Sequence, residues 1–233
     1  MVAILAPVLG PRFVVLSCLA AASCAAPVMG LGTGALHPYG PDEPVRSQGV
    51  QLHGAARLAA GRGRQTAQFD GSGSLLLRRV FSLDLGIAVT QVQQEVDGGV
   101  LNAFGAFPYL RPRINVGPVS IAVALAGLGF GGGGGGLFGG IADLQVGYGT
   151  DRWSVYGGAY GQYYEIVSEG NQRTSGSQLR AGGELARRYG RTRLALALEL
   201  YRHHDELGGD GVDSEQTFVG GGLKLRVASP VLQ

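Results

Sequence analysis

The sequence predicts an all-β protein: a closed antiparallel up-and-down β-barrel of about ten strands, with eight or twelve strands as alternatives. Three observations favour this fold. From residue 49 onward, apolar and polar residues alternate with a period of two, the period of side chains along a β-strand. The alternating runs are about 10 to 14 residues long, whereas soluble strands average about 5 or 6. The charged residues of these runs fall on the face opposite the Leu and Val residues.

The composition argues against several other classes of protein. Glycine accounts for 42 of the 233 residues, more than twice the usual share of about 7%. The glycines show no collagen repeat and stand among apolar residues, which argues against a disordered linker. The 19 basic and 17 acidic residues nearly balance, so no nucleic-acid partner is expected. Both cysteines lie in the first 24 residues, which leaves no disulfide framework or thiolate metal site in the rest of the chain.

The N-terminal residues 1–26 are interpreted as a signal peptide. The apolar run Phe13–Ala22 follows Arg12 and resembles the hydrophobic stretch of a secretory signal. It is too short to cross a bilayer as a helix. The run continues into LAAASC, which resembles a bacterial lipobox with Cys24 as the lipidated residue. Cys18 is a second candidate, and ordinary cleavage near Ala25 or Ala26 is the alternative. Residues 27–48, rich in Pro and Gly, are then predicted to be a periplasmic linker, residues 49–229 the barrel, and residues 230–233 a C-terminal tail.

Ten segments account for the predicted strands. None shows the apolar residues at i, i+3 and i+4 that a helix would need. Val100–Arg111 is the least regular, because Pro108 lies within it and Pro cannot donate to a sheet ladder. Clear alternation marks the segments near 50–58, 68–78, 83–90, 179–188, 194–201 and 218–227, and Val100–Arg111, Val119–Phe130, Leu137–Tyr148 and Trp153–Glu165 complete the number.

The connections between these segments also fall into two alternating sets. Short periplasmic turns and longer external loops are typical of outer-membrane barrels, and an even strand number would place both ends of the barrel in the periplasm. The predicted tight set is Arg79-Val80, Pro112–Pro118, Thr150–Arg152 and Tyr189–Arg191. The predicted external set is Gly61–Thr66, Glu95–Gly99, Gly131–Gly136, Ser168–Ser175 and Asp205–Ser214.

The strand charges are expected inside the barrel. Lipid offers no hydrogen-bond partners, so a spanning sheet must close on itself, and Arg or Lys facing lipid at mid-depth costs about 2 to 4 kcal/mol. A small barrel is only wide enough for side chains, and buried charges need partners. The predicted lumen network of paired charges consists of Arg57, Arg78, Asp84, Arg180, Glu184, Glu199, Lys224 and Arg226.

Five aromatic residues near strand ends are expected to form an interfacial belt, with ordinary strand propensity as the alternative. They are Tyr148, Trp153, Tyr163, Tyr189 and Tyr201. Over about residues 49–228 the whole pattern resembles small bacterial outer-membrane β-barrel proteins as a class. The resemblance implies export to the outer membrane of a Gram-negative bacterium and contact with outer-membrane lipid. Proteins of this class often end on an aromatic residue, whereas this chain ends on Gln233.

One cluster carries catalytic residue types: His203, His204 and Asp205, with Glu199 four residues earlier. Adjacent strand residues point to opposite faces, so His203 is expected inside with Glu199, and His204 at the lipid face or rim. Neither arrangement places a nucleophile beside an oriented base, so no enzymatic activity is expected. A metal site would need a further ligand, and the glycines 131–136 lack the Lys and helix of a phosphate loop. No metal or cofactor is therefore expected.

The sequence thus favours a narrow or plugged lumen and a structural, anchoring or surface-interaction role, with any external ligand and the oligomeric state left open. Three alternatives remain. One is a small pore or transporter, a second is a barrel hydrolase that uses His203 or His204, and a third is a soluble periplasmic lipid-binding barrel. Strand length and the scarcity of outward charge favour the membrane over the third alternative.

Overall fold

The computed structural model describes residues 49–61, 63–77, 80–96, 99–132, 135–150, 152–167, 172–207 and 214–228. Within these residues the chain forms ten strands and no helix, and so no helix of the described part is long and apolar enough to cross a membrane. The strands are β1 (Gly49–Gly61), β2 (Arg64–Leu76), β3 (Phe81–Val96), β4 (Gly99–Val116), β5 (Val119–Gly132), β6 (Gly135–Gly149), β7 (Trp153–Val167), β8 (Gln172–Tyr189), β9 (Thr192–Leu207) and β10 (Ser214–Ala228).

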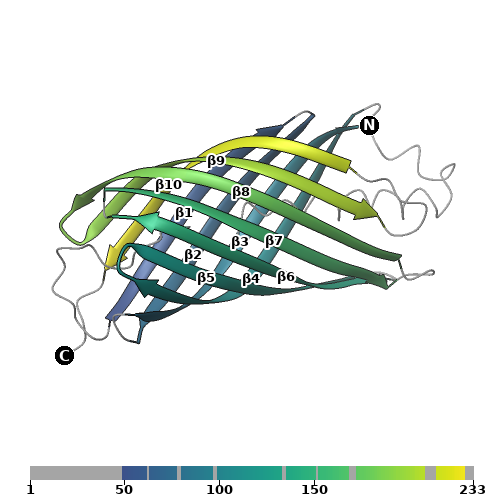
Figure 1. The fold of residues 1–233 in the computed structure, drawn as a ribbon. Helices are drawn as coiled ribbons and strands as arrows, with labels where there is room; N and C mark the ends of the chain where they lie inside the picture. The colour runs from purple at the N-terminus through teal and green to yellow at the C-terminus, as the bar shows by residue number, and fades with distance from the viewer. Residues whose placement is uncertain are drawn as a thin grey trace, which may run out of the picture.

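The ten strands form a closed barrel, as predicted. Each strand pairs antiparallel with the strands before and after it in sequence, and β1 closes the ring against β10 from Gln51↔Ala228 to Gly61↔Phe218. The strands are steeply tilted to the long direction of the barrel (Figure 1). Because the strand number is even, β1 begins and β10 ends at the same end of the barrel, which we call the terminal end; the other is the distal end.

The predicted connections are wrong in detail, because the strands are longer than expected and reach 18 residues in β4 and β8. Most of Pro112–Pro118 belongs to β4, and only Gly117-Pro118 turns, with Gly117 at φ +55°. The glycine tract 131–136 is largely strand as well, because backbone pairs such as Gly131↔Gly136 continue the ladder without side chains. The expected contrast between short turns and long loops is therefore small, although the gaps between β7 and β8 and between β9 and β10 are the longest at the distal end.

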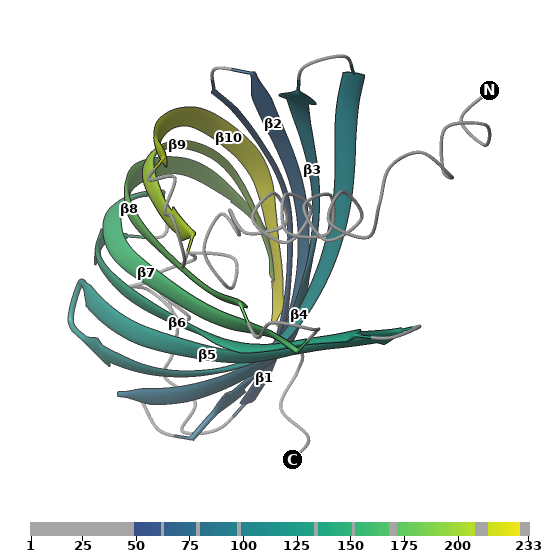
Figure 2. The same cartoon turned by 90° about the vertical axis from the view of Figure 1, so that its right-hand side faces the viewer.

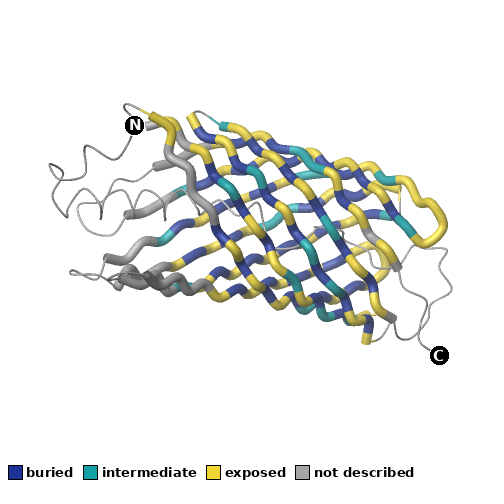
Figure 3. The backbone as a smooth tube through the Cα atoms, turned by 180° about the vertical axis from the view of Figure 1, so that it is seen from behind, coloured by how far each residue is buried: buried dark blue, intermediate teal, exposed yellow. Residues whose placement is uncertain are grey.

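Buried and exposed residues alternate along most of the strands (Figure 3). In β9, Leu196 and Leu198 are 69% and 70% exposed on the outside, while Ala195 and Ala197 between them are buried. Leu, Val, Ile and Phe dominate the exposed positions of the other strands. Described outward charges such as Glu95, Arg187 and Arg202 lie toward strand ends. The barrel is therefore apolar outside and polar inside.

The expected aromatic belt is found at four of its five positions as outward-facing rings. Tyr148, Trp153 and Tyr189 are exposed at the terminal end, where the Tyr148 and Trp153 ring centroids lie 5.8 Å apart. Tyr163 is exposed toward the distal end of β7. Tyr201 is a correction: it is only 1% exposed, because the odd positions of β9 point into the barrel.

Candidate functional site

The candidate site is the barrel interior, where the structure gathers most of the charged side chains that the sequence singled out. Six of the eight predicted residues are buried there: Arg57, Asp84, Arg180, Glu184, Glu199 and Lys224. Arg226 occupies a β10 position opposite His53 and Arg193 in the register. Arg78 and Cys24 lie outside the described residues.

Asp84 is the centre of the first cluster. Arg111 Nε donates to Asp84 Oδ2 at 2.7 Å, and Arg113 Nη2 donates to the same oxygen at 2.7 Å. Ser74 Oγ donates to the other carboxylate oxygen at 2.5 Å and lies 2.7 Å from His53 Nε2. The register explains this cluster, because Ser74 and Arg111 stand directly opposite Asp84 on β2 and β4. Two guanidinium groups thus neutralise and hold one buried carboxylate.

Glu199 is the centre of the second cluster, on the other side of the lumen. The hydroxyls of Tyr156 and Tyr201 both donate to its carboxylate. Lys224 Nζ lies 3.4 Å from Glu199 Oε1 and donates to the Tyr156 hydroxyl at 2.7 Å. The same ammonium lies 3.4 Å from Glu184 Oε2. Strands β7 to β10 are therefore connected by one continuous network of charged and phenolic side chains.

Several long side chains reach across an intervening strand, and a glycine lies beneath each of them. Tyr109 of β4 donates to Asp70 of β2 at 2.8 Å and covers Gly86 of β3. Arg180 of β8 donates to Asp143 of β6 at 2.7 and 2.9 Å, and a Cβ atom on Gly158 of β7 would lie 2.9 Å from Arg180 Nε.

The contact between Tyr156 of β7 and Glu199 of β9 follows the same rule. A Cβ atom on Gly182 of β8 would lie 3.0 Å from Tyr156 Cε2 and 2.9 Å from Glu199 Cγ. In these three places glycine provides the room that lets a side chain bind a partner two strands away. The high glycine content therefore has a packing role inside the barrel.

Every described buried carboxylate of the lumen has a cationic partner. Asp70 is the most loosely paired, with its Oδ2 3.9 Å from Arg57 Nη2, whereas Arg193 Nη2 donates to Glu184 Oε1 at 2.6 Å. Counting histidine as neutral, the seven buried cations of the described residues exceed their five buried anions by two. The cations are Arg57, Arg64, Arg111, Arg113, Arg180, Arg193 and Lys224, and the anions are Asp70, Asp84, Asp143, Glu184 and Glu199.

Several members of the lumen network were missed from the sequence. Arg113 was assigned to a turn, and Arg111 to the end of an irregular run, because Pro108 and Pro112 obscured the alternation of β4. Asp143 lies two strands away from its partner Arg180, so parity alone does not connect them. Extending the period of two through both prolines would have placed Arg111 and Arg113 inside.

The two histidines lie on opposite faces, as their parity predicted. His203 is buried and stands opposite Gln178 and Gln216 in the register. His204 is half-buried on the outer face, and its register neighbours are Ser177 of β8 and Glu215 of β10. Among the described residues, no group of three His, Cys, Asp or Glu side chains is placed to hold a metal ion.

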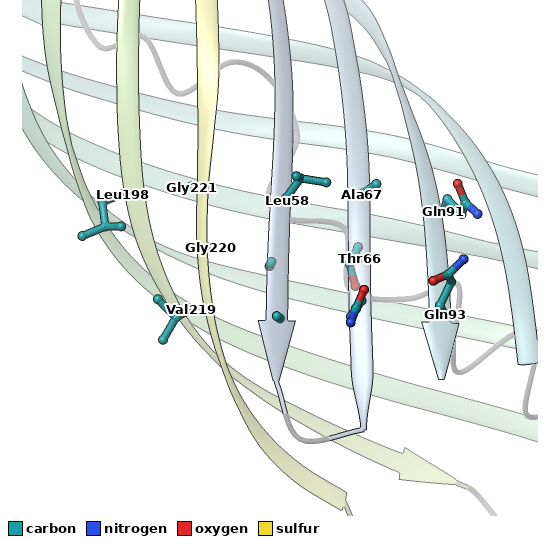
Figure 4. A pocket seen from close by; sticks show the side chains of 12 residues that line it. Leu58, Thr66, Ala67, Gln91, Gln93, Leu198, Val219, Gly220 and Gly221 are labelled. Atoms are coloured by element: carbon teal, nitrogen blue, oxygen red, sulfur yellow. The ribbon is translucent and has the colours of Figure 1, made fainter. Parts of the chain in front are cut away.

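A hollow of about 560 Å³ lies near the distal ends of β1, β2, β3 and β10 (Figure 4). Most of its lining residues face outward, including Leu58, Ala60 and Ala67, so the hollow belongs to the outer wall and is no axial channel. Gln65 and Gln93 stand opposite each other at its edge. These amides mark the level at which the apolar exterior gives way to polar side chains.

Comparisons with known proteins find no family for this chain. No protein-family model and no curated protein matches the chain. Among solved structures, the chain is similar to the outer-membrane OmpT of Vibrio cholerae, with 11% identity and a TM-score of 0.39. The match covers 71% of this chain and 64% of the OmpT chain, which is less than two thirds of the OmpT length. It is also similar to the β domain of the Bordetella autotransporter BrkA, with 9% identity and a TM-score of 0.43, over 79% of this chain and all of that one. Neisserial surface protein A gives 13% identity and a TM-score of 0.32, over 79% and 99% of the two chains.

The first of these solved structures is described as expressed in the outer membrane, and the other two are described as an autotransporter domain and a surface protein. At such low identities and TM-scores the likeness carries no information on activity, substrate or partner. The barrel itself, with its closed antiparallel wall, confirms the predicted fold class.

The glycine beneath Tyr156 and Glu199 allows a sharp test of the lumen packing. We expect Gly182→Ala to lower the free energy of unfolding by about 1 to 3 kcal/mol, because a methyl group there must displace both side chains and the Leu198 carbonyl oxygen. The matched control is Gly183→Ala on the outer face, where a Cβ atom would meet nothing closer than 3.5 Å. Urea unfolding of both variants in detergent micelles is the measurement. Equal stability of the two variants would show that the lumen is not packed as described.

Proposed function

We propose that the chain is an outer-membrane β-barrel protein whose lumen is closed by its own paired side chains, and that it has a structural, anchoring or surface-interaction role. The distribution of side chains across the wall carries this proposal. From residue 194 to residue 200 every outward side chain of β9 is Leu, while Glu199 and Tyr201 face inward. A soluble lipid carrier would have the opposite arrangement, with a polar exterior and an apolar lumen.

The size of the wall also supports a membrane location. A tilted strand needs about 9 to 11 residues to cross a bilayer, and the shortest strands here, β1 and β2, have 13. Closure leaves no open sheet edge between β1 and β10, which is the requirement that lipid imposes on a spanning sheet. Export by the N-terminal segment, and lipidation at Cys24, belong to the same proposal and concern residues outside the described part.

The two clusters around Asp84 and Glu199 support a closed lumen. The first bridges β2, β3 and β4, and the second bridges β7 to β10, so long side chains project from both sides of a narrow interior. A ten-stranded barrel is little wider than the eight-stranded barrels that side chains fill. A general diffusion pore would need this space to be open.

Planar-bilayer recording tests the closed lumen. The purified full chain should insert without producing large, steady conductance steps, because the ion pairs hold side chains across the interior. Insertion is checked on vesicles of the same preparation, in which the protein should resist extraction with carbonate. Large, steady steps would establish the transport alternative, and release by carbonate would establish the soluble one.

A second candidate function rests on the register around His204. Ser177 and Glu215 flank this histidine on the neighbouring strands, and directly opposed strand residues have Cβ atoms about 4.5 to 5.5 Å apart. Serine, histidine and a carboxylate are the residue types of a hydrolase with an activated nucleophile. Because Ser177 and His204 are on the outer face, lipid esters would be the accessible substrates.

A lipase assay separates the two candidate functions. Under the structural role, the purified protein should release no fatty acid from phospholipid vesicles. If fatty acid is released, Ser177→Ala and His204→Ala should each abolish the release, whereas the control Ser175→Ala, two positions along the same face of β8, should not. That outcome would replace the structural role with a hydrolytic one.

A further inference from the structure

The backbone ladder of the barrel is interrupted between β4 and β5. Their ladder runs from the turn at Val116↔Val119 only as far as Tyr109↔Ala126. Beyond that point, residues 99–108 of β4 continue to pair with β3, and residues 127–132 of β5 continue to pair with β6. Seen along the barrel, the distal part of β4 follows β3 while β5 stays beside β6, and the two strands diverge (Figure 2). We call this interruption the β4–β5 seam.

Two prolines account for the seam. In an antiparallel strand the N–H groups of alternate residues point to opposite neighbours. Asn115 donates its N–H to Val80 at 2.7 Å, on the β3 side, so odd residues of β4 bond toward β3 and even residues bond toward β5. Pro108 and Pro112 are both even and have no N–H to donate. Accordingly, Pro112 has no paired residue on β5, and the ladder to β5 ends one residue before Pro108. Both prolines are paired with residues of β3.

An apolar patch lies inside the barrel directly behind the seam. It includes Phe107 and Tyr109 of β4, Ala124 and Ala126 of β5, Ile141 of β6 and Tyr160 of β7. The Phe107 ring lies over Gly105, where a Cβ atom would be 2.6 Å from Phe107 Cζ, so the ring extends along the stretch of β4 that pairs with β3 and not with β5. Most other inward positions carry polar or small side chains. The interruption of the wall and the largest apolar patch of the described lumen therefore coincide.

The outer face at the start of the seam is apolar as well. Pro108 stands opposite Ile87 and Ala106 opposite Val89 in the register with β3. Leu125, on the other side of the seam, is 53% exposed. The first polar outward residue of β3 beyond this level is Gln91. If the barrel spans the outer membrane as proposed above, the seam starts where acyl chains end and lipid headgroups begin.

We propose that the β4–β5 seam binds an outer-leaflet lipid, whose acyl chain passes sideways from the bilayer onto the patch around Phe107. The chemistry of the seam matches an amphiphile. The patch offers apolar contact for a chain, and the facing backbone edges of β4 and β5 offer N–H and C=O groups to the ester or hydroxyl oxygens of a headgroup. The barrel then takes up its ligand through the wall, and a closed axial lumen is no obstacle to binding. This proposal rests on the membrane placement in the proposed function.

Tryptophan quenching by brominated lipid tests the seam. Trp153 is the only tryptophan of the chain, so the reporters are made in a Trp153→Phe background. Phe107→Trp reports on the patch, and Leu125→Trp reports on the outward-facing wall beside the seam. Phe218→Trp reports on an inward position of β10 that is as deeply buried as Phe107 but lies where the ladder to β1 is continuous. Each variant is reconstituted in phosphatidylcholine vesicles with plain or brominated acyl chains. Since bromine quenches by contact, we expect the Phe107→Trp signal to fall nearly as much as that of Leu125→Trp, and several-fold more than that of Phe218→Trp.

The possible outcomes separate the two proposals. Loss of quenching at Leu125→Trp would overturn the membrane placement. The seam proposal alone would be overturned if Leu125→Trp is quenched but Phe107→Trp is quenched no more than Phe218→Trp. Tyr160→Trp, on the opposite side of the same patch, serves as a second reporter if Phe107→Trp does not fold. Pro108→Thr combined with Pro112→Thr restores two donors toward β5 and should reduce the quenching of the patch, and unchanged quenching would contradict the role of the prolines.

Discussion

The structure depends on a single constraint: a sheet whose outside is apolar must satisfy its backbone groups within itself, and so it must close. Closure turns the alternation of side chains into a strict division between outside and inside. Charges, which are scarce on the described outer face, accumulate in a lumen bounded by ten strands. Inside such a narrow space an unpaired charge is costly. The paired charges around Asp84 and Glu199 therefore follow from the closure of a wall whose exterior is apolar.

Glycine resolves the conflict between a crowded lumen and the need for ion pairs. Neighbouring strands do not always present opposite charges, so side chains must reach further. Tyr109, Tyr156 and Arg180 each find a partner two strands away, and the strand between them offers a glycine at the crossing point. Closure is relaxed at the β4–β5 seam, where two prolines withhold donors from one neighbour only. The barrel thus combines a lumen held together by side-chain contacts with a wall whose backbone pairing is interrupted between β4 and β5.

Much of this could be predicted from the sequence, because a period of two assigns each residue of a strand to a face. Parity placed Glu199 and His203 inside and His204 outside without any knowledge of pairing. Parity also places Tyr201 inside with Glu199, and its assignment to the aromatic belt was wrong because that assignment rested on nearness to a strand end. Parity failed for β4, because a proline removes a donor on one side of a strand while the ladder on the other side can hold the strand together. Partners such as Arg180 and Asp143, which lie 37 positions apart in sequence, depend on register and strand order.

A spin-label scan along β9 tests the central claim most directly, because the chain has no cysteine after Cys24. Single cysteines are placed at each position from Leu194 to Tyr201, and the labelled protein is reconstituted in lipid vesicles. The structure predicts that labels at even positions collide with oxygen dissolved in the lipid, while labels at odd positions are immobilised and shielded from it, with a period of two across the whole segment. Access of a water-soluble nickel chelate to Leu196 and Leu198, with no oxygen maximum there, would contradict a membrane-spanning barrel with a charged interior.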